Sequence, residues 1–436
     1  MNVLNIEKQI GIETFLSDGI GIGGKLRKKP EDFIVSEISI KPPEKIDGKF
    51  SIAKITSTNW ETNKLIKELS DKLHISRQRI GFAGTKDKRA KTTQLFSFYK
   101  INKQEIKEIS IKDVEIEDVF QSDRPVKIGI LSGNNFKITI NDLKNNAQKK
   151  DIKKTNLTIQ KNNGFPNFYG IQRFGIIRPI THIVGKYLVR ADFQKAVMTY
   201  IANPIKGEDD QTYNLRKDLQ EKCDFSAALK KYPDQLNFEK AMLNILVKDP
   251  DDFIGALKQL PKNLLTMFVY AYQSFLFNKI LSMRIKKGLP LNNAIIGDIV
   301  LPVRNDIIDD KAIMVKENNI DKVNVQMSKN KAFVSGLLYG SDSVFSDGEM
   351  GEIERKIIKK ENIDPRDFII PEIPFISSSG SRRALLCSVE DLKYDLFENP
   401  DDKTKKSAVL EFSLRKGSYA TSLLREFMKA DDIRNY

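Results

Sequence analysis

The sequence of 436 residues contains little cysteine, histidine or tryptophan: two Cys, two His and one Trp. Cys223 and Cys387 are far apart and belong to no C-x-x-C pair, which excludes a disulfide framework and a cysteine-rich zinc site. We expect both to be small buried residues. The two histidines, His74 and His182, leave little imidazole for metal binding or acid–base catalysis. No D-x-[DN]-x-[DN]-G loop is present, and no metal site is predicted.

Long apolar runs are also missing. No run approaches the roughly 20 apolar residues that a membrane-spanning helix needs, and the first residues, MNVLNIEKQIGIETFL, lack a basic segment followed by an apolar one. We therefore expect a soluble, cytoplasmic protein with no membrane partner. A 40% apolar composition over this length supplies cores for two or three domains.

Positive charge is in excess. Lysine and arginine number 72 against 58 acidic residues, which gives a formal charge of +14 and a pI near 9.3. This excess must lie mostly on the surface, so polyanions such as nucleic acids are the expected partners.

A glycine-rich segment near the start imitates nucleotide-binding motifs. Gly19–Gly24 fits G-x-G-x-x-G, and with Lys25 it nearly fits a P-loop. A P-loop needs Ser or Thr after the lysine, but Leu26 follows; both motifs need a helix next, but Pro30 and an extended run at 33–38 follow. We interpret the segment as a flexible loop, which weakens the hypothesis of a nucleotide-dependent RNA enzyme.

The first part of the chain alternates between strand and helix patterns. Strands are predicted at Phe33–Ile38 and Lys49–Thr56. A helix is predicted over Trp60–His74, where leucines recur every four residues and Thr58 and Glu61 form a capping box.

The segment GFAGTKDKRA, residues 81–90, combines one carboxylate with three cations. Strand patterns at Ile80–Ala83 and Thr92–Tyr99 flank it, so Asp87 is predicted to lie on a loop between two strands. Converging cations would attract a phosphate backbone, which suits nucleophilic or basic chemistry on a polyanion. A plain surface turn is the alternative interpretation.

Helical patterns dominate from about Asn167, including Asn263–Lys287, and strand patterns resume at Arg382–Val389 and Ala408–Leu414. A helical block between two β-rich ends indicates that one domain is inserted into another. We expect residues 1–166 and 381–436 to form a discontinuous catalytic domain, and residues 167–380 to form the insertion.

Several uncommon motifs occur in one order: PEDF, GTKD followed by TTQ, PNFYGIQRFG, SRRALL and GSYATSLLRE. Together they cover nearly the whole chain, and the sequence resembles the TruD-type pseudouridine synthases, which act on uridine 13 of transfer RNA. The long helical insertion is similar to that of archaeal members.

The resemblance implies an α+β pseudouridine synthase fold with a mixed, largely antiparallel sheet and helices, interrupted by a mainly helical TRUD insertion domain. It also implies an RNA isomerase that takes tRNA as its partner and uses no cofactor. We expect the protein to be a monomer. In such enzymes a flipped-out uracil is detached from C1′ of its ribose, rotated, and rejoined through C5.

The resemblance assigns the catalytic aspartate of GTKD to Asp87, and it leaves three roles open: nucleophile at the sugar, nucleophile at the base, or base at C2′. Arg27, three residues before the proline of PEDF, is implied as the cation that orients this carboxylate. Phe33 and Tyr419 correspond to substrate-contacting aromatics, and Asn134 to an amide suited to a uracil edge. Phe136, from the same SGNNF motif, is a further substrate-binding candidate.

We predict RNA contacts from Lys86, Lys88, Arg89, Gln172 and Arg173. A different class of function stays open beside catalysis, namely a tRNA-binding or chaperone protein that performs no chemistry. The presence of Asp87 together with Arg27 and Phe33 favours the enzyme.

Overall fold

The computed structural model describes residues 3–304, 307–309, 311–399 and 402–436. The chain forms two compact units. Ser17–Phe165 and Cys387–Tyr436 form one, which we call the sheet unit, and Met1–Leu16 with Pro166–Leu386 form the other, the helical unit. These bounds differ from the expected domains at both ends of the chain.

The N-terminal segment groups with the helical unit because helix α11 (Lys262–Lys286) holds its main chain. Asn278 donates to the carbonyl oxygen of Ile10 at 2.9 Å, and Ser282 donates to that of Gly11 at 2.9 Å. Such bonds between distant segments leave no local sequence pattern, so the sequence alone does not place residues 1–16 with the helical unit.

The sheet unit is built on a mixed sheet. In the described part of the chain its strands lie in the order β15–β16–β7–β2–β5–β3–β6, with β1 paired to β7 and β4 paired to β5. The pairing of β2 with β5 is parallel, and the other pairings within this sheet are antiparallel. The α+β class with a mixed, largely antiparallel sheet is thereby confirmed.

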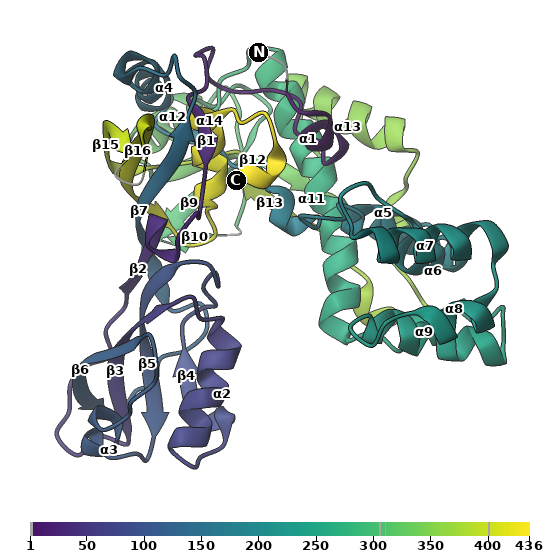
Figure 1. Ribbon diagram of the computed structural model, residues 1–436. Helices are drawn as coiled ribbons and strands as arrows, with labels where there is room; N and C mark the ends of the chain where they lie inside the picture. The colour runs from purple at the N-terminus through teal and green to yellow at the C-terminus, as the bar shows by residue number, and fades with distance from the viewer. Residues whose placement is uncertain (1–2, 305–306, 310, 400–401) are drawn as a thin grey trace. The chain divides into compact units, whose positions relative to one another are not determined.

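The strands and helices of the sheet unit (Figure 1) are β1 (Gly23–Lys25), β2 (Phe33–Ser39), β3 (Phe50–Thr58), α2 (Thr62–Lys72), β4 (Ile80–Phe82), β5 (Lys91–Tyr99), α3 (Lys103–Lys107), β6 (Val114–Ser122), β7 (Leu131–Leu143), α4 (Lys149–Lys161), β15 (Glu390–Asn399), β16 (Asp402–Arg415) and α14 (Ala420–Met428). The short strands β8 (Phe165–Pro166) and β14 (Leu386–Cys387) lie at the unit boundaries.

Helix α2 packs on β3 and β5 (Figure 1), where Leu65 and Leu69 join a buried cluster with Phe96. Each buried leucine side chain contributes about 2 kcal/mol through the hydrophobic effect. The helix starts later than expected, and the predicted capping box is wrong. Its N-cap is Glu61 itself, whose carboxylate accepts from the main-chain N–H groups at positions 63 and 64.

Helices α4 and α14 bury a second cluster against β2, β7 and β16, including Ile152, Ile138 and Phe427. The side chains of Phe33 and Val35 belong to this cluster. Direct cross-strand neighbours point to the same side of a sheet. The strand register therefore makes this buried side continuous from β16 through β7, β2 and β5 to β3.

The glycine segment at 19–24 is not the flexible loop expected from its composition. It packs against the end of α14, where a Cβ atom on Gly21 would lie 2.3 Å from the carbonyl oxygen of Met428. The ammonium group of Lys429 donates to the carbonyl oxygens of Ser17 and Gly19. Glycine is needed here for close approach of two main chains.

The helical unit contains α1 (Asn5–Gln9), α5 (Thr181–Val189), α6 (Phe193–Ala202), α7 (Asp210–Lys222), α8 (Phe225–Lys231), α9 (Asn237–Lys248), α10 (Phe253–Leu257), α11, α12 (Ile320–Ser328) and α13 (Gly348–Glu361). It also holds an unexpected antiparallel sheet of β9 (Ile299–Arg304), β10 (Ile307–Ile308), β11 (Ile313–Met314), β12 (Ala332–Leu338) and β13 (Ser381–Ala384).

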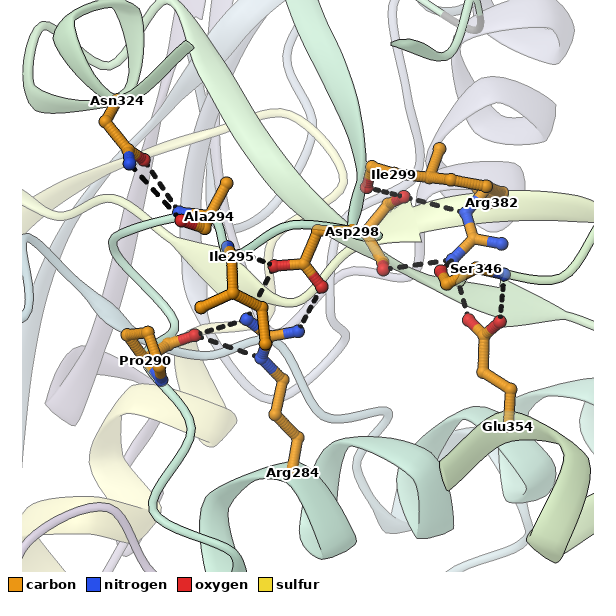
Figure 2. A network of polar contacts seen from close by, with 11 residues as sticks. Arg284, Pro290, Ala294, Ile295, Asp298, Ile299, Asn324, Ser346, Glu354 and Arg382 are labelled. Carbon is orange, nitrogen blue, oxygen red and sulfur yellow. Dashed lines mark hydrogen bonds and ion pairs between the residues drawn. The ribbon is translucent and has the colours of Figure 1, made fainter. Parts of the chain in front are cut away.

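Strand β13 contains the first residues of the SRRALL motif and belongs to this second sheet, since Ala384 lies opposite Ser335 of β12. Arg382 donates to the carboxylate of Glu354 at 2.6 Å and to the hydroxyl of Ser346 at 2.9 Å (Figure 2). Residues 381–386 therefore group with the helical unit, and Arg382 of the motif pairs with Glu354 inside that unit.

Beside this group, Arg284 and Asp298 form a fully buried ion pair, with N–O distances of 2.6 and 2.8 Å (Figure 2). Both side chains are 0% exposed. A buried pair of this kind depends on the presence of both partners, because either charge left alone in the interior is strongly destabilising.

Cys387 is buried as expected, whereas the expectation for Cys223 is wrong. Cys223 is exposed at the C-terminal end of α7, where the main chain turns with a φ of 52°. Among the described helices, none is long and apolar enough to cross a membrane.

Candidate active site

Asp87 and Arg27, sixty positions apart in the sequence, meet in the sheet unit. The Nη2 atom of Arg27 donates to the Oδ2 atom of Asp87 at 2.6 Å. The Arg27 side chain is 17% exposed, whereas that of Asp87 is 61% exposed. The guanidinium is thus anchored in the protein, and the carboxylate that it holds is open to solvent.

Arg27 has an uncommon main-chain conformation and stacks on an aromatic ring. Its φ of 56° lies in the left-handed region, which costs a non-glycine residue about 1 kcal/mol or more. Its guanidinium carbon lies 4.0 Å from the centre of the Phe33 ring. Stacking on an aromatic face restrains the guanidinium plane, so the cation is held in place before any substrate arrives.

Phe33 is a buried residue of this site. It is 2% exposed, and its ring meets that of Phe136 edge-on, with 6.4 Å between ring centres. The ring packs against the Arg27 guanidinium, and the expected contact of Phe33 with the substrate stays a prediction.

The loop carrying Asp87 joins β4 to β5, as the sequence predicts. Lys88 and Arg89 are exposed on it, as RNA-contacting residues need to be. Lys86 is not available in the same way: its ammonium group lies 2.9 Å from the Oε2 atom of Glu37, and the two side chains are 7% and 0% exposed. The Lys86 ammonium group is thus paired with Glu37, and the expected RNA contact from Lys86 stays a prediction.

Asn134 and Phe136 alternate on β7 and face the same side of the sheet. Asn134 lies directly opposite Glu37 of β2, and Phe136 stacks on Phe412 with 5.2 Å between ring centres. Among the described residues, the Oδ1 atom of Asn134 has no hydrogen-bond partner although it is buried. An amide with an unused polar atom is suited to pairing with a polar base edge.

The close approach of two strands positions Asn134. A Cβ atom on the preceding Gly133 would lie 2.2 Å from the carbonyl oxygen of Leu414 on β16. Leu414 is also the direct neighbour of Asn134 across the sheet. Tyr419 follows five residues later, partly exposed and at the N-cap of α14, so it lies beyond the strand end that faces Asn134.

Gln172 and Arg173 belong to the other unit. They lie in a single 3-10 turn, Ile171–Arg173, where the Arg173 guanidinium lies 5.4 Å from the ring centre of Tyr169. Gln172 is exposed and Arg173 is partly buried. The geometry of the sheet unit thus brings together Asp87, Arg27 and their neighbours without these two residues.

Two residues of the site were missed by sequence reasoning. Glu37 binds Lys86, and the hydroxyl of Thr62, the first residue of α2, accepts from the main-chain N–H of Lys86 at 2.8 Å. A signal for Glu37 was present: Phe33 and Val35 alternate as the buried face of a strand, and a carboxylate then takes the next position on that face. Such a residue needs a buried cation.

The site contains one exposed carboxylate held by one guanidinium, with two exposed cations on the same loop. This set suits nucleophilic or basic chemistry by a carboxylate on an anionic substrate. In the described ranges, no group of three or more histidine, cysteine, aspartate or glutamate side chains is placed to hold a metal ion.

Comparisons with known proteins identify the family of this chain. The family model described as tRNA pseudouridine synthase D (TruD) matches residues 9–427. A relative from Methanococcoides burtonii is 44% identical, with 99% of each chain covered, and one from Methanosarcina barkeri is 43% identical over all of both chains; each is named Probable tRNA pseudouridine synthase D. A crystal structure from Methanosarcina mazei with the same family name superposes with a TM-score of 0.91, at 41% identity and complete coverage of both chains.

Proposed function

Because this chain belongs to the tRNA pseudouridine synthase D family, we propose that it isomerises uridine to pseudouridine in transfer RNA and that Asp87 is its catalytic residue. The family agrees with the RNA isomerase expected from the sequence. The observation that carries the assignment of Asp87 is its solvent-open carboxylate, held at 2.6 Å by the fixed guanidinium of Arg27.

The reaction moves one bond. The bond between N1 of uracil and C1′ of ribose breaks, the base rotates, and a bond forms between C5 and C1′; the proton on C5 is lost and N1 gains one. The Asp87 carboxylate can act on the sugar, on the base or at C2′, and these roles stay open. Arg27 holds the carboxylate for each of them.

Substrate recognition requires the uridine to leave its stack. Asn134 offers an unused amide atom for the uracil edge, and Phe136 and Tyr419, both partly exposed, are the aromatic residues that can replace lost stacking. Lys88 and Arg89 lie on the catalytic loop itself, where phosphate contacts would bring the RNA backbone to Asp87.

The finer features are also proposals: uridine 13 as the target, action as a monomer, and a cytoplasmic location. The sheet unit then serves as the catalytic domain and the helical unit as the TRUD insertion domain, with Gln172 and Arg173 contacting RNA. Light scattering after size-exclusion chromatography tests the monomer, because a dimer would show twice the chain mass of 49.8 kDa.

A single assay tests the catalytic proposal. Purified protein is incubated with unmodified tRNA without cofactor, and pseudouridine is mapped by carbodiimide-dependent stops of reverse transcription. We expect a stop at uridine 13 that disappears with Asp87→Asn. The matched control is Asp118→Asn on β6, which makes the same chemical change two strands away from β5, the strand that follows the Asp87 loop.

The outcomes separate the parts of the proposal. A stop elsewhere in the tRNA would remove the assignment of uridine 13 alone. An unchanged stop with Asp87→Asn would remove the assigned catalytic residue. Binding of tRNA without any stop would favour the non-catalytic tRNA-binding or chaperone alternative, which none of the comparisons supports.

A further inference from the structure

The residue before the proposed catalytic aspartate is a buried cation. The Nζ atom of Lys86 donates to Oε2 of Glu37 at 2.9 Å, and the hydroxyl of Ser39 donates to Oε1 of the same carboxylate at 2.6 Å. Both carboxylate oxygens of Glu37 thus have a donor. Neither charge is free to contact RNA, since the two side chains are 7% and 0% exposed.

Lys86 is anchored a second time through its main chain. Its N–H donates to the hydroxyl of Thr62 at 2.8 Å, and Thr62 is a buried residue in the first turn of α2. The side chain ties the loop to β2 while the main chain ties it to α2. Asp87, the next residue, projects from this doubly fixed point and is 61% exposed.

The partner of Lys86 also lies at the proposed base-recognition position. Glu37 is the direct cross-strand neighbour of Asn134, and such neighbours have Cβ atoms about 5 Å apart on the same face. One carboxylate therefore connects the catalytic loop to the strand position that holds the uracil-binding amide.

We propose that Lys86 and Glu37 are positioning residues that set the place of Asp87 relative to Asn134. This inference rests on the catalytic role of Asp87 proposed above. A buried ion pair is weak evidence for stability, because well-packed apolar residues of similar volume often replace one without loss. In this inference the ion pair acts by fixing the position of Asp87, because a misplacement of about 1 Å at a catalytic group can lower the rate about 100-fold.

The test uses the double variant Lys86→Met with Glu37→Leu, which removes both charges and keeps the volume. We expect it to bind tRNA with a Kd within about threefold of the parent, because neither side chain is accessible to RNA. The single-turnover rate at saturating tRNA should fall about 100-fold. Lys86→Arg, which preserves a cation for Glu37, should recover about tenfold of that loss.

Two further variants keep the result decisive. Glu37→Gln retains the shape of the side chain and the bond from Ser39, so it reports on the lost charge even if the double variant fails to fold; its rate should fall about tenfold. The control Lys54→Met removes a lysine–glutamate pair from the opposite face of the same sheet, where Lys54 lies 3.2 Å from Glu117. Its rate should stay within about twofold of the parent.

A parental single-turnover rate in the folded double variant, or in Glu37→Gln where the double variant does not fold, would overturn the inference. A weakened Kd with an unchanged rate would also overturn it and would restore Lys86 to the RNA-contacting residues. Failure of the proposed function looks different, since the parent protein would then form no pseudouridine or Asp87→Asn would remain active.

Discussion

Replacing Arg27 by methionine separates the orientation of Asp87 from the stability of the fold. The substitution keeps an unbranched apolar stem similar to that of arginine but removes the guanidinium. Two contacts disappear: the 2.6 Å hydrogen bond to Asp87 and the stacking at 4.0 Å on Phe33. The first contact touches the proposed catalytic carboxylate, and the second touches a buried ring.

The two losses differ in size. Asp87 is 61% exposed, so the ion pair contributes about 1 kcal/mol or less to folding, and the cation–π contact contributes a similar amount. We therefore expect the free energy of unfolding to fall by about 1 to 2 kcal/mol. A hydrogen bond to a charged group that must be aligned for reaction is worth about 1.5 to 3 kcal/mol, which corresponds to about 10- to 150-fold in rate.

The assay is the single-turnover rate of pseudouridine formation at saturating tRNA, measured beside a urea unfolding curve at the same temperature. Arg27→Lys is the matched variant, because it preserves the charge but lacks the planar group that stacks on Phe33. We expect its rate to fall between those of the parent and Arg27→Met. A rate for Arg27→Met within about threefold of the parent would refute the orienting role.

Two further predictions concern the helical unit. Arg284→Met leaves the fully buried carboxylate of Asp298 unpaired, so the free energy of unfolding should fall by about 3 to 5 kcal/mol in urea titrations. The double variant Arg284→Met with Asp298→Leu should recover most of this lost stability. A double variant as unstable as the single one would contradict the explanation. Burial lowers the pKa of His182 from 6.5 to about 4. Between about pH 6.5 and pH 4 the imidazole is therefore protonated in the unfolded chain but not in the folded protein. Stability should therefore decrease by about 3 kcal/mol as the pH falls from 7 to 4, and His182→Gln should lack this part of the decrease; parallel curves for parent and variant would show that His182 does not titrate in this way.

Local patterns in the sequence were sufficient for much of the architecture. The leucine repeat predicted α2, the apolar period predicted α11, and the two strand patterns around GTKD placed Asp87 on a loop between β4 and β5. These features depend on residues near one another in the chain, so periodicity and turn chemistry describe them directly. The ordered motifs likewise identified the family.

The partners of individual residues were decided by tertiary structure. Whether Lys86 faces RNA or Glu37 depends on where the loop lies against strand β2, 49 positions earlier in the chain, and no local period encodes that. The same holds for Phe33, whose ring is buried beneath Arg27, and for the N-terminal segment, whose carbonyl groups bind α11. The sequence by itself determined the family and the position of Asp87 in the chain; long-range packing decided which neighbouring charges are buried to hold that residue and which stay exposed for the substrate.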